Sequence, residues 1–265
     1  MHRKHTYVNT ILRLLWDKKE KTSFKLPARG RGAYNIGMNV YAMADLHLSL
    51  SVENKSMEVF GARWKDHIKK IEEGWRGTVT AEDIVLINGD ISWALQTRDA
   101  YADLFFLHGL PGRKILLRGN HDYWWPGYSK LLTLLPPSVT AVQNNTVRVG
   151  GITAGGTRGW NIPGSGVFSE EKDRKIYERE KLRLQLSLNG FQEGGENYLM
   201  LHFPPFTEKD THSEITEMIE SSPVKHVVYG HLHGIAGKDA FEGEQNGVFY
   251  HFTAADKLNF VPKRL

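Results

Sequence analysis

Residues 115–122 read Ile-Leu-Leu-Arg-Gly-Asn-His-Asp, an apolar run that ends in a cluster of polar side chains. A short apolar run closed by glycine is typical of a buried strand, so the polar residues would lie at the carboxyl end of that strand. The same pattern recurs after the apolar runs 39–43, 84–87, 198–201 and 227–229. Because open α/β sheets bind ligands at the carboxyl edge of their strands, we expect the five polar segments to meet at one site.

The five polar segments are rich in side chains that bind metal ions. They are Asp45-Leu46-His47, Gly89-Asp90, Gly119-Asn120-His121-Asp122, His202 and Gly230-His231-Leu232-His233. Asp45 and His47 are alternate residues, so they would face the same side of an extended chain. The chain has no cysteine, so any metal must be held by His, Asp, Asn or Glu. This absence excludes disulfides and fits a reducing compartment, so we expect a cytoplasmic protein.

In this order, and each after a β-like run, the five motifs resemble those of the calcineurin-like metallophosphoesterase superfamily. The resemblance runs from about Val40 to His233 and covers most of the chain. It implies an α/β fold, a four-layer αββα sandwich in which two mixed β-sheets pack face to face with helices outside.

The resemblance also implies a centre of two divalent metal ions. One ion would be held by Asp45, His47, Asp90 and His233, and the other by Asp90, Asn120, His202 and His231. Asp90 would bridge the two ions. Imidazole, carboxylate and amide ligands suit manganese, iron, zinc or magnesium, and these residues do not choose among the four metals.

The implied activity is hydrolysis of a phosphoester bond. Two ions about 3.5 to 4 Å apart can activate a shared water and stabilise the entering and leaving oxygens. His121 would assist the leaving group, because histidine is suited to proton donation near neutral pH. Asp122 is better explained as a cap or brace of the turn than as a catalytic group. Arg158, in a glycine-rich segment, is the candidate for binding substrate phosphate together with the ligand Asn120.

One residue departs from the pattern of the superfamily. Many relatives carry an acid or an arginine three residues after the bridging aspartate, where this chain has Trp93. Phosphoprotein phosphatases use that region to bind phosphate, so Trp93 favours a phosphodiester or a small phosphorylated metabolite as substrate. Two alternatives stay open: a nuclease, and a non-catalytic protein-binding scaffold such as a subunit of the retromer coat. The complete ligand set and His121 favour an enzyme.

Charge is unevenly distributed along the chain. Residues 1–37 hold nine Lys or Arg against two acidic residues, a net charge of +7, which leaves −3 for the other 228 residues. We therefore expect a basic, dispensable N-terminal extension followed by one metallophosphoesterase domain over residues 38–265. A basic amphipathic helix around residues 11–16 is the competing interpretation of the extension.

The same balance bears on the class of partner. A mildly acidic domain does not favour the broad phosphate contacts of DNA binding, although nucleic acid is not excluded as a substrate. No apolar stretch reaches the roughly 20 residues that cross a bilayer, so no transmembrane segment is expected. The expected partner is a small-molecule phosphoester.

Apolar spacing predicts the elements between the motifs. Residues 58–75 place apolar and aromatic side chains three or four apart, which predicts one amphipathic helix with its aromatics, Phe60 included, in the core. A second helix is expected over 97–108, and this alternation implies parallel strands with helical crossovers. The runs 139–142 and 146–153 predict antiparallel strands of a second sheet, joined by tight turns.

Overall fold

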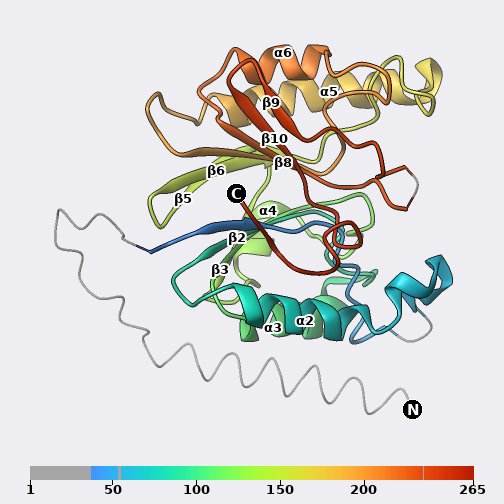
Figure 1. The fold of residues 1–265 in the computed structure, drawn as a ribbon, viewed down its shortest axis with the longest axis vertical. Helices are drawn as coiled ribbons and strands as arrows, with labels where there is room; N and C mark the ends of the chain where they lie inside the picture. The colour runs from blue at the N-terminus through green and yellow to red at the C-terminus, as the bar shows by residue number, and fades with distance from the viewer. Residues whose placement is uncertain (1–36, 53–54, 235) are drawn as a thin grey trace.

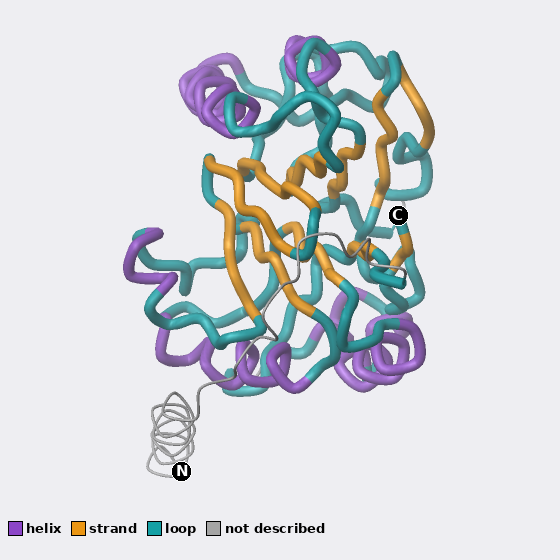
Figure 2. The backbone as a smooth tube through the Cα atoms, turned by 90° about the vertical axis from the view of Figure 1, so that its left-hand side faces the viewer, coloured by secondary structure: helices purple, strands orange, loops and turns teal. Residues whose placement is uncertain are grey.

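The structure is a computed structural model that describes residues 37–52, 55–234 and 236–265. The predicted basic extension, residues 1–37, lies outside the described residues apart from Gly37. Two β-sheets pack face to face between two layers of helices, which confirms the expected αββα sandwich (Figure 1; Figure 2). In the described part of the chain, no helix is both long and apolar enough to span a membrane.

The first sheet has five strands in the order β11-β1-β2-β3-β4. Their bounds are Val40–Ala42 (β1), Ile84–Asn88 (β2), Arg113–Leu117 (β3), Val139–Val142 (β4) and Lys263–Arg264 (β11). Strands β1 to β4 run parallel, and β11 is antiparallel at the edge. Every residue of β2 is buried, as expected for a parallel strand covered on both faces.

The second sheet has six strands in the order β5-β6-β7-β8-β10-β9. Their bounds are Asn145–Val149 (β5), Ile152–Thr157 (β6), Asn197–Leu201 (β7), His226–Tyr229 (β8), Gly243–Gln245 (β9) and Val248–Phe252 (β10). The four central strands are parallel, and β5 and β9 are antiparallel edges. The predicted strands before the five motifs therefore coincide with β1, β2, β3, β7 and β8.

Helices cover the outer face of each sheet (Figure 1). The first sheet carries α2 (His67–Thr78) and α3 (Tyr101–Gly109), which extends the short 3-10 helix η3 (Thr97–Ala100). The second sheet carries α5 (Glu170–Leu188) and α6 (Glu214–Glu220). The short α4 (Tyr128–Leu132) precedes β4. A third apolar cluster lies between the two sheets and joins them into one core.

The helix predicted over 58–75 is wrong in its first half. The segment forms two 3-10 turns, η1 (Met57–Phe60) and η2 (Ala62–Trp64), before α2 begins. Gly61 separates the two turns with φ +120°, a conformation that side chains rarely adopt. As a result Phe60 is 65% exposed instead of lying in the core, whereas Trp64 is buried as expected.

The predicted turn between 139–142 and the next strand is also different. β4 does not form an antiparallel pair with β5; it adds to the first sheet, parallel to β3. The chain then crosses to the second sheet, where β5 and β6 form an antiparallel hairpin that turns at Gly150-Gly151, within the predicted run 146–153. β6 continues to Thr157, so Gly155 and Gly156 of the glycine-rich segment belong to a strand, and Arg158 follows its end.

Candidate metal centre

The predicted ligands converge where five parallel strands end. Asp45 follows β1, Asp90 follows β2 and Asn120 follows β3 in the first sheet, while His202 follows β7 and His231 follows β8 in the second. The two sheets thus bring their carboxyl edges to one place, as expected for ligand binding in this class of fold.

The backbone at Asp45 and His47 differs from the extended conformation that was predicted to bring their side chains to one side. Neither residue is extended, since Asp45 has φ +61° and His47 has φ +46°. Asp90 (φ +51°) and His231 (φ +72°) are also left-handed. Non-glycine residues seldom adopt this region, and such strain persists only where the surroundings hold it, commonly at functional sites.

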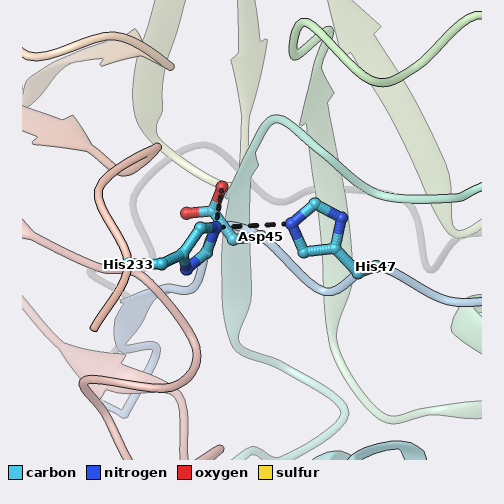
Figure 3. A group of neighbouring side chains, drawn as sticks. All are labelled: Asp45, His47 and His233. Carbon is cyan, nitrogen blue, oxygen red and sulfur yellow. Dashed lines mark hydrogen bonds and ion pairs between the residues drawn. The ribbon is translucent and has the colours of Figure 1, made fainter. Parts of the chain in front are cut away.

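Asp45, His47 and His233 form a first group of side chains whose ligand atoms lie within 4.8 Å of one another (Figure 3). Nε2 of His233 is 3.6 Å from Oδ1 of Asp45 and 3.4 Å from Nε2 of His47. Nε2 of His47 is in turn 3.9 Å from Oδ2 of Asp90. The four ligands predicted for one ion are therefore neighbours.

Asp45, Asp90 and His202 form a second group at the same spacing. Nε2 of His202 lies 3.4 Å from Oδ2 of Asp90 and 2.7 Å from Oδ1 of Asn120. Nδ1 of His202 lies 3.1 Å from the carbonyl oxygen of Asn88, which fixes the ring orientation and leaves Nε2 facing the other ligands. Asp45 belongs to both groups, so the groups adjoin.

The remaining predicted ligand, His231, packs at the edge of the second group. Its ring centroid is 5.1 Å from that of His202, and its backbone N–H donates to Oδ2 of Asp45 at 2.9 Å. Gly230 must be glycine, because a Cβ there would lie 2.4 Å from Oδ2 of Asp45. A Cβ on Gly119 would similarly lie 2.1 Å from Oδ1 of Asp90. These glycines let the ligand loops approach each other closely.

The donor set fits divalent metal ions. Burial lowers the pKa of His47 and of His231 to about 3, so both imidazoles stay neutral, the form that binds a metal. Burial raises the pKa of Asp45 to about 6, and its buried Oδ1 lacks a hydrogen-bond partner among the described residues. A buried oxygen without a donor is unfavourable unless a cation or proton meets it.

The pKa shifts of His202 and Asp90 also indicate a site that suits a cation. Burial alone would lower the pKa of His202, but the carboxylates of Asp90 and Asp45 raise it to about 9. Burial opposes ionisation of Asp90 as well, yet His202 and His47 hold the pKa of Asp90 well below its usual range. The site therefore attracts positive charge, which a bound cation would supply in place of the proton on His202.

His121 lies beside this cluster, against Trp93. Its backbone N–H donates to Oδ1 of Asp90 at 2.8 Å, and its ring centroid lies 4.8 Å from that of Trp93. Trp93 also stacks on His47, with centroids 4.9 Å apart and planes 22° apart, and its Nε1 donates to Sδ of Met57. The indole thus stands where the superfamily pattern predicts a charged residue, and it contacts both histidines.

Asp122 acts as a brace. The carboxylate is fully buried, and its Oδ1 accepts hydrogen bonds from the backbone of Ile91 and Ser92 and from the Trp124 indole. Its Oδ2 accepts from the backbone N–H of Gly119 at 2.8 Å. Asp122 therefore ties together the loops that carry Asp90 and the Asn120-His121 pair.

Arg158 lies next to a ligand loop, and its side chain contacts Trp160 and Glu180. Its guanidinium packs over Trp160, 4.6 Å from the ring centroid, and lies 3.9 Å from Oε1 of Glu180. Its backbone carbonyl accepts from the N–H groups of His202 and Phe203, both at 3.0 Å. The backbone of Arg158 thus holds a ligand loop, and contact between its side chain and phosphate stays a prediction.

Asp256 is a site residue that the sequence reasoning missed. It follows β10 and is 4% exposed, with Oδ1 3.1 Å from Nδ1 of His233 and Oδ2 accepting from the backbone of Gly234. A carboxylate on the far nitrogen of a ligand histidine orients the ring. The available signal was its position, since Asp256 follows an apolar strand as the predicted ligands do.

A cleft of about 710 Å³ opens at the cluster. Four candidate ligands, His47, Asp90, His231 and His233, line it together with the candidate proton donor His121. The volume falls within the roughly 300 to 1,000 Å³ typical of small-molecule sites.

Comparisons with known proteins agree with this geometry. The model of the calcineurin-like phosphoesterase family matches residues 38–234. The Gene 66 protein of Mycobacterium phage D29 is 27% identical over 195 residues, which are 74% of this chain and 78% of the phage protein.

Among solved structures, a phosphopantetheinyl hydrolase from Mycobacterium tuberculosis is similar in fold, with a TM-score of 0.53 and 14% identity over 86% of this chain and 95% of that one. A protein of unknown function from Aquifex aeolicus has the same identity and coverage at a TM-score of 0.45. Because the family match spans most of the chain and ends just beyond the last predicted ligand, His233, the chain belongs to the calcineurin-like phosphoesterase family and is a metallophosphoesterase.

Proposed function

We propose that this enzyme hydrolyses a phosphodiester or a small phosphorylated metabolite, and that it does so with two divalent metal ions. One ion would be held by Asp45, His47, Asp90 and His233, and the other by Asp90, Asn120, His202 and His231. Bound there, the ions would supply Lewis-acid chemistry, which makes water more acidic and offsets negative charge on phosphoryl oxygens. Manganese is the first metal to test.

The observation that carries the proposal is the convergence of Asp45, Asp90 and His202. These three buried side chains come from motifs up to 157 residues apart and place ligand atoms within 4.8 Å of one another. Burying two carboxylates together is unfavourable unless positive charge lies between them. A metal centre explains why the fold keeps them there.

His121 would act on the leaving group. The side chain lines the cleft next to Asp90, and the hydrogen bond from its backbone to Asp90 fixes its distance from the centre. Its imidazole would donate a proton to the leaving oxygen, which is general acid catalysis. The floor of the cleft would hold the phosphoryl group, with the Asn120 amide in contact with it.

The preference for a diester or a small metabolite is supported by Trp93. The indole fills the space next to His121 with an apolar ring where many relatives have a charged residue. A second anchored charge for a phosphomonoester dianion is therefore missing at that position, which favours the singly charged diester.

Hydrolysis of bis-p-nitrophenyl phosphate and p-nitrophenyl phosphate, with manganese added, tests the proposal. Wild type should hydrolyse the diester faster than the monoester. The kcat of Asp90→Asn should be at least about 100-fold lower than that of wild type, which is the loss seen when one group that stabilises the transition state is removed. Metal content of both proteins should be measured in parallel. Folded wild-type protein that hydrolyses neither compound with manganese, zinc, iron or magnesium would contradict the proposal.

The proposal takes residues 38–265 as the catalytic domain and residues 1–37 as a dispensable extension. The family match begins at residue 38, and β1 follows directly. A protein that lacks residues 1–37 should keep the thermal midpoint and the kcat of the full chain. A large loss of either would show that the extension takes part in the domain.

A further inference from the structure

The cleft at the metal centre has an aromatic wall and a cationic rim. We propose that it binds a nucleoside phosphate, that is, a phosphoester whose remainder has a flat aromatic ring and a further anionic group. The inference rests on the proposed function, because it specifies the substrate class of the same site.

The aromatic wall consists of Phe60, Trp64 and Trp93, and Met57, which accepts a hydrogen bond from the Trp93 indole, lines the cleft beside them. Phe60 ends the 3-10 turn η1 and is 65% exposed, although the sequence pattern would bury it in a helix. A large exposed aromatic side chain next to a catalytic centre offers its face to a ligand. Flat bases stack on such faces, and the gain is similar for every base.

The cationic rim consists of Arg63, Lys238 and Lys257. Arg63 is held in place, because its Nη1 donates to the backbone carbonyl of Asp256 at 2.8 Å. Neither lysine has an acidic partner within 4.0 Å among residues 37–52, 55–234 and 236–265. Three cations at one cleft contrast with the net charge of −3 outside residues 1–37, and they would favour an anion.

The two surfaces lie on one cleft that also reaches the ligand cluster. The acidic groups in its lining are Asp90, which belongs to the cluster, and Asp256, which is engaged with His233. Arg63 lies near Asp256 and interacts with its charge, whereas Lys238 and Lys257 have no further carboxylate in that lining. The volume of about 710 Å³ exceeds what a phosphate group alone would fill, so it can take a ring and a second anionic group together.

Competitive inhibition of bis-p-nitrophenyl phosphate hydrolysis tests the inference, with manganese in excess over all phosphates. Ribose 5-phosphate, AMP and ADP form a matched series, in which AMP adds the ring and ADP adds charge. We expect AMP to bind about tenfold more tightly than ribose 5-phosphate, in the range of base stacking on one aromatic side chain. ADP should bind at least about threefold more tightly than AMP.

Two variants test whether the aromatic wall causes the affinity difference between ribose 5-phosphate and AMP, and whether the cationic rim causes that between AMP and ADP. Phe60→Ala should remove most of the difference between ribose 5-phosphate and AMP, and the double variant Lys238→Ala/Lys257→Ala most of that between AMP and ADP. Leu182→Ala and Lys175→Ala, exposed positions on α5, should leave both differences unchanged.

Equal inhibition by all three compounds in an enzyme that hydrolyses the diester would overturn the inference and leave the proposed function intact. Differences that survive in the Phe60 and lysine variants would also overturn it. Absence of diester hydrolysis would instead count against the proposed function.

Discussion

Oδ1 of Asp256 lies 3.1 Å from Nδ1 of His233. A carboxylate from the segment after β10 therefore contacts a predicted metal ligand from the loop after β8. The His233 side chain is one-third exposed, and Asp256 contacts the nitrogen that faces away from Asp45 and His47. The family match ends at residue 234, so this partner lies outside it. The C-terminal segment thus completes the candidate centre.

Replacing Asp256 should weaken metal binding. In Asp256→Asn the charge that orients His233 is lost while the size is kept, and we expect manganese affinity to fall between roughly 10- and 100-fold. Isothermal titration calorimetry, in which manganese is added to metal-free protein, measures this affinity directly. Asp239→Asn, an exposed acid in the segment between β8 and β9 that also carries His233, is the matched control. Equal affinity in the two variants would contradict the role given to Asp256.

Trp93 should matter most for poor leaving groups. Trp93→Ala removes the ring that packs on both His47 and His121, so His121 loses its orientation while Trp93→Phe keeps a ring in place. We expect kcat for a phenyl ester to fall about 100-fold in the alanine variant, the lower end of what general acid catalysis contributes. The p-nitrophenyl ester needs less protonation and should lose far less. A uniform loss for both esters would show that Trp93 only supports the fold.

Gly119 should not tolerate a side chain. A Cβ there would lie 2.1 Å from Oδ1 and 2.2 Å from the backbone N of Asp90, and the backbone cannot yield without moving a ligand. We expect Gly119→Ala to lose roughly 1 to 3 kcal/mol of unfolding free energy and most of its manganese binding. Gly109→Ala, where a Cβ meets nothing within 4 Å, is the control. Thermal midpoints and bound manganese that match wild type would refute the steric argument.

The convergence of the candidate ligands could be predicted from the sequence because the pattern is local. Each ligand directly follows an apolar strand, so parallel pairing alone brings Asp45 and Asp90 to one edge. Asp256 was missed although it too follows an apolar strand, because its role is a contact with His233, 23 residues away in the chain, and it belongs to none of the five motifs.

The exposure of Phe60 could not be predicted from a local pattern either. Its spacing fits a helix, but Gly61 at φ +120° and Asp66 at φ +53° break the segment into turns, and this overrides the apolar period. The left-handed backbone of Asp45 and His47 was equally hidden, since only the packed loops hold it. Phe60 and His47, which the sequence misjudged, and Asp256, which it missed, all line the cleft.

Asp103, a buried carboxyl group outside the candidate metal centre, should make the stability of the protein depend on pH. It is buried on α3, where Oδ2 accepts from the Ser92 hydroxyl at 2.5 Å and Oδ1 accepts from the backbone of Leu50 at 2.9 Å. Burial raises the pKa of Asp103 to about 6, although both hydrogen bonds oppose the shift. The folded protein therefore keeps a proton on Asp103 between pH 4 and 6 that the unfolded chain has released.

Since the folded state binds the extra proton, the contribution of Asp103 to the free energy of unfolding is complete below pH 4 and falls as pH rises to 6. The pKa difference corresponds to about 3 kcal/mol. Asp103→Asn resembles the protonated acid, because its amide can still accept from Leu50 and donate to Ser92. Urea unfolding at pH 4 and pH 7 should therefore show similar stability of wild type and variant at pH 4, and a variant that is more stable by about 3 kcal/mol at pH 7. A stability difference that is the same at both pH values would mean that Asp103 is ionised in the folded protein throughout, with its charge fully compensated by Ser92 and Leu50.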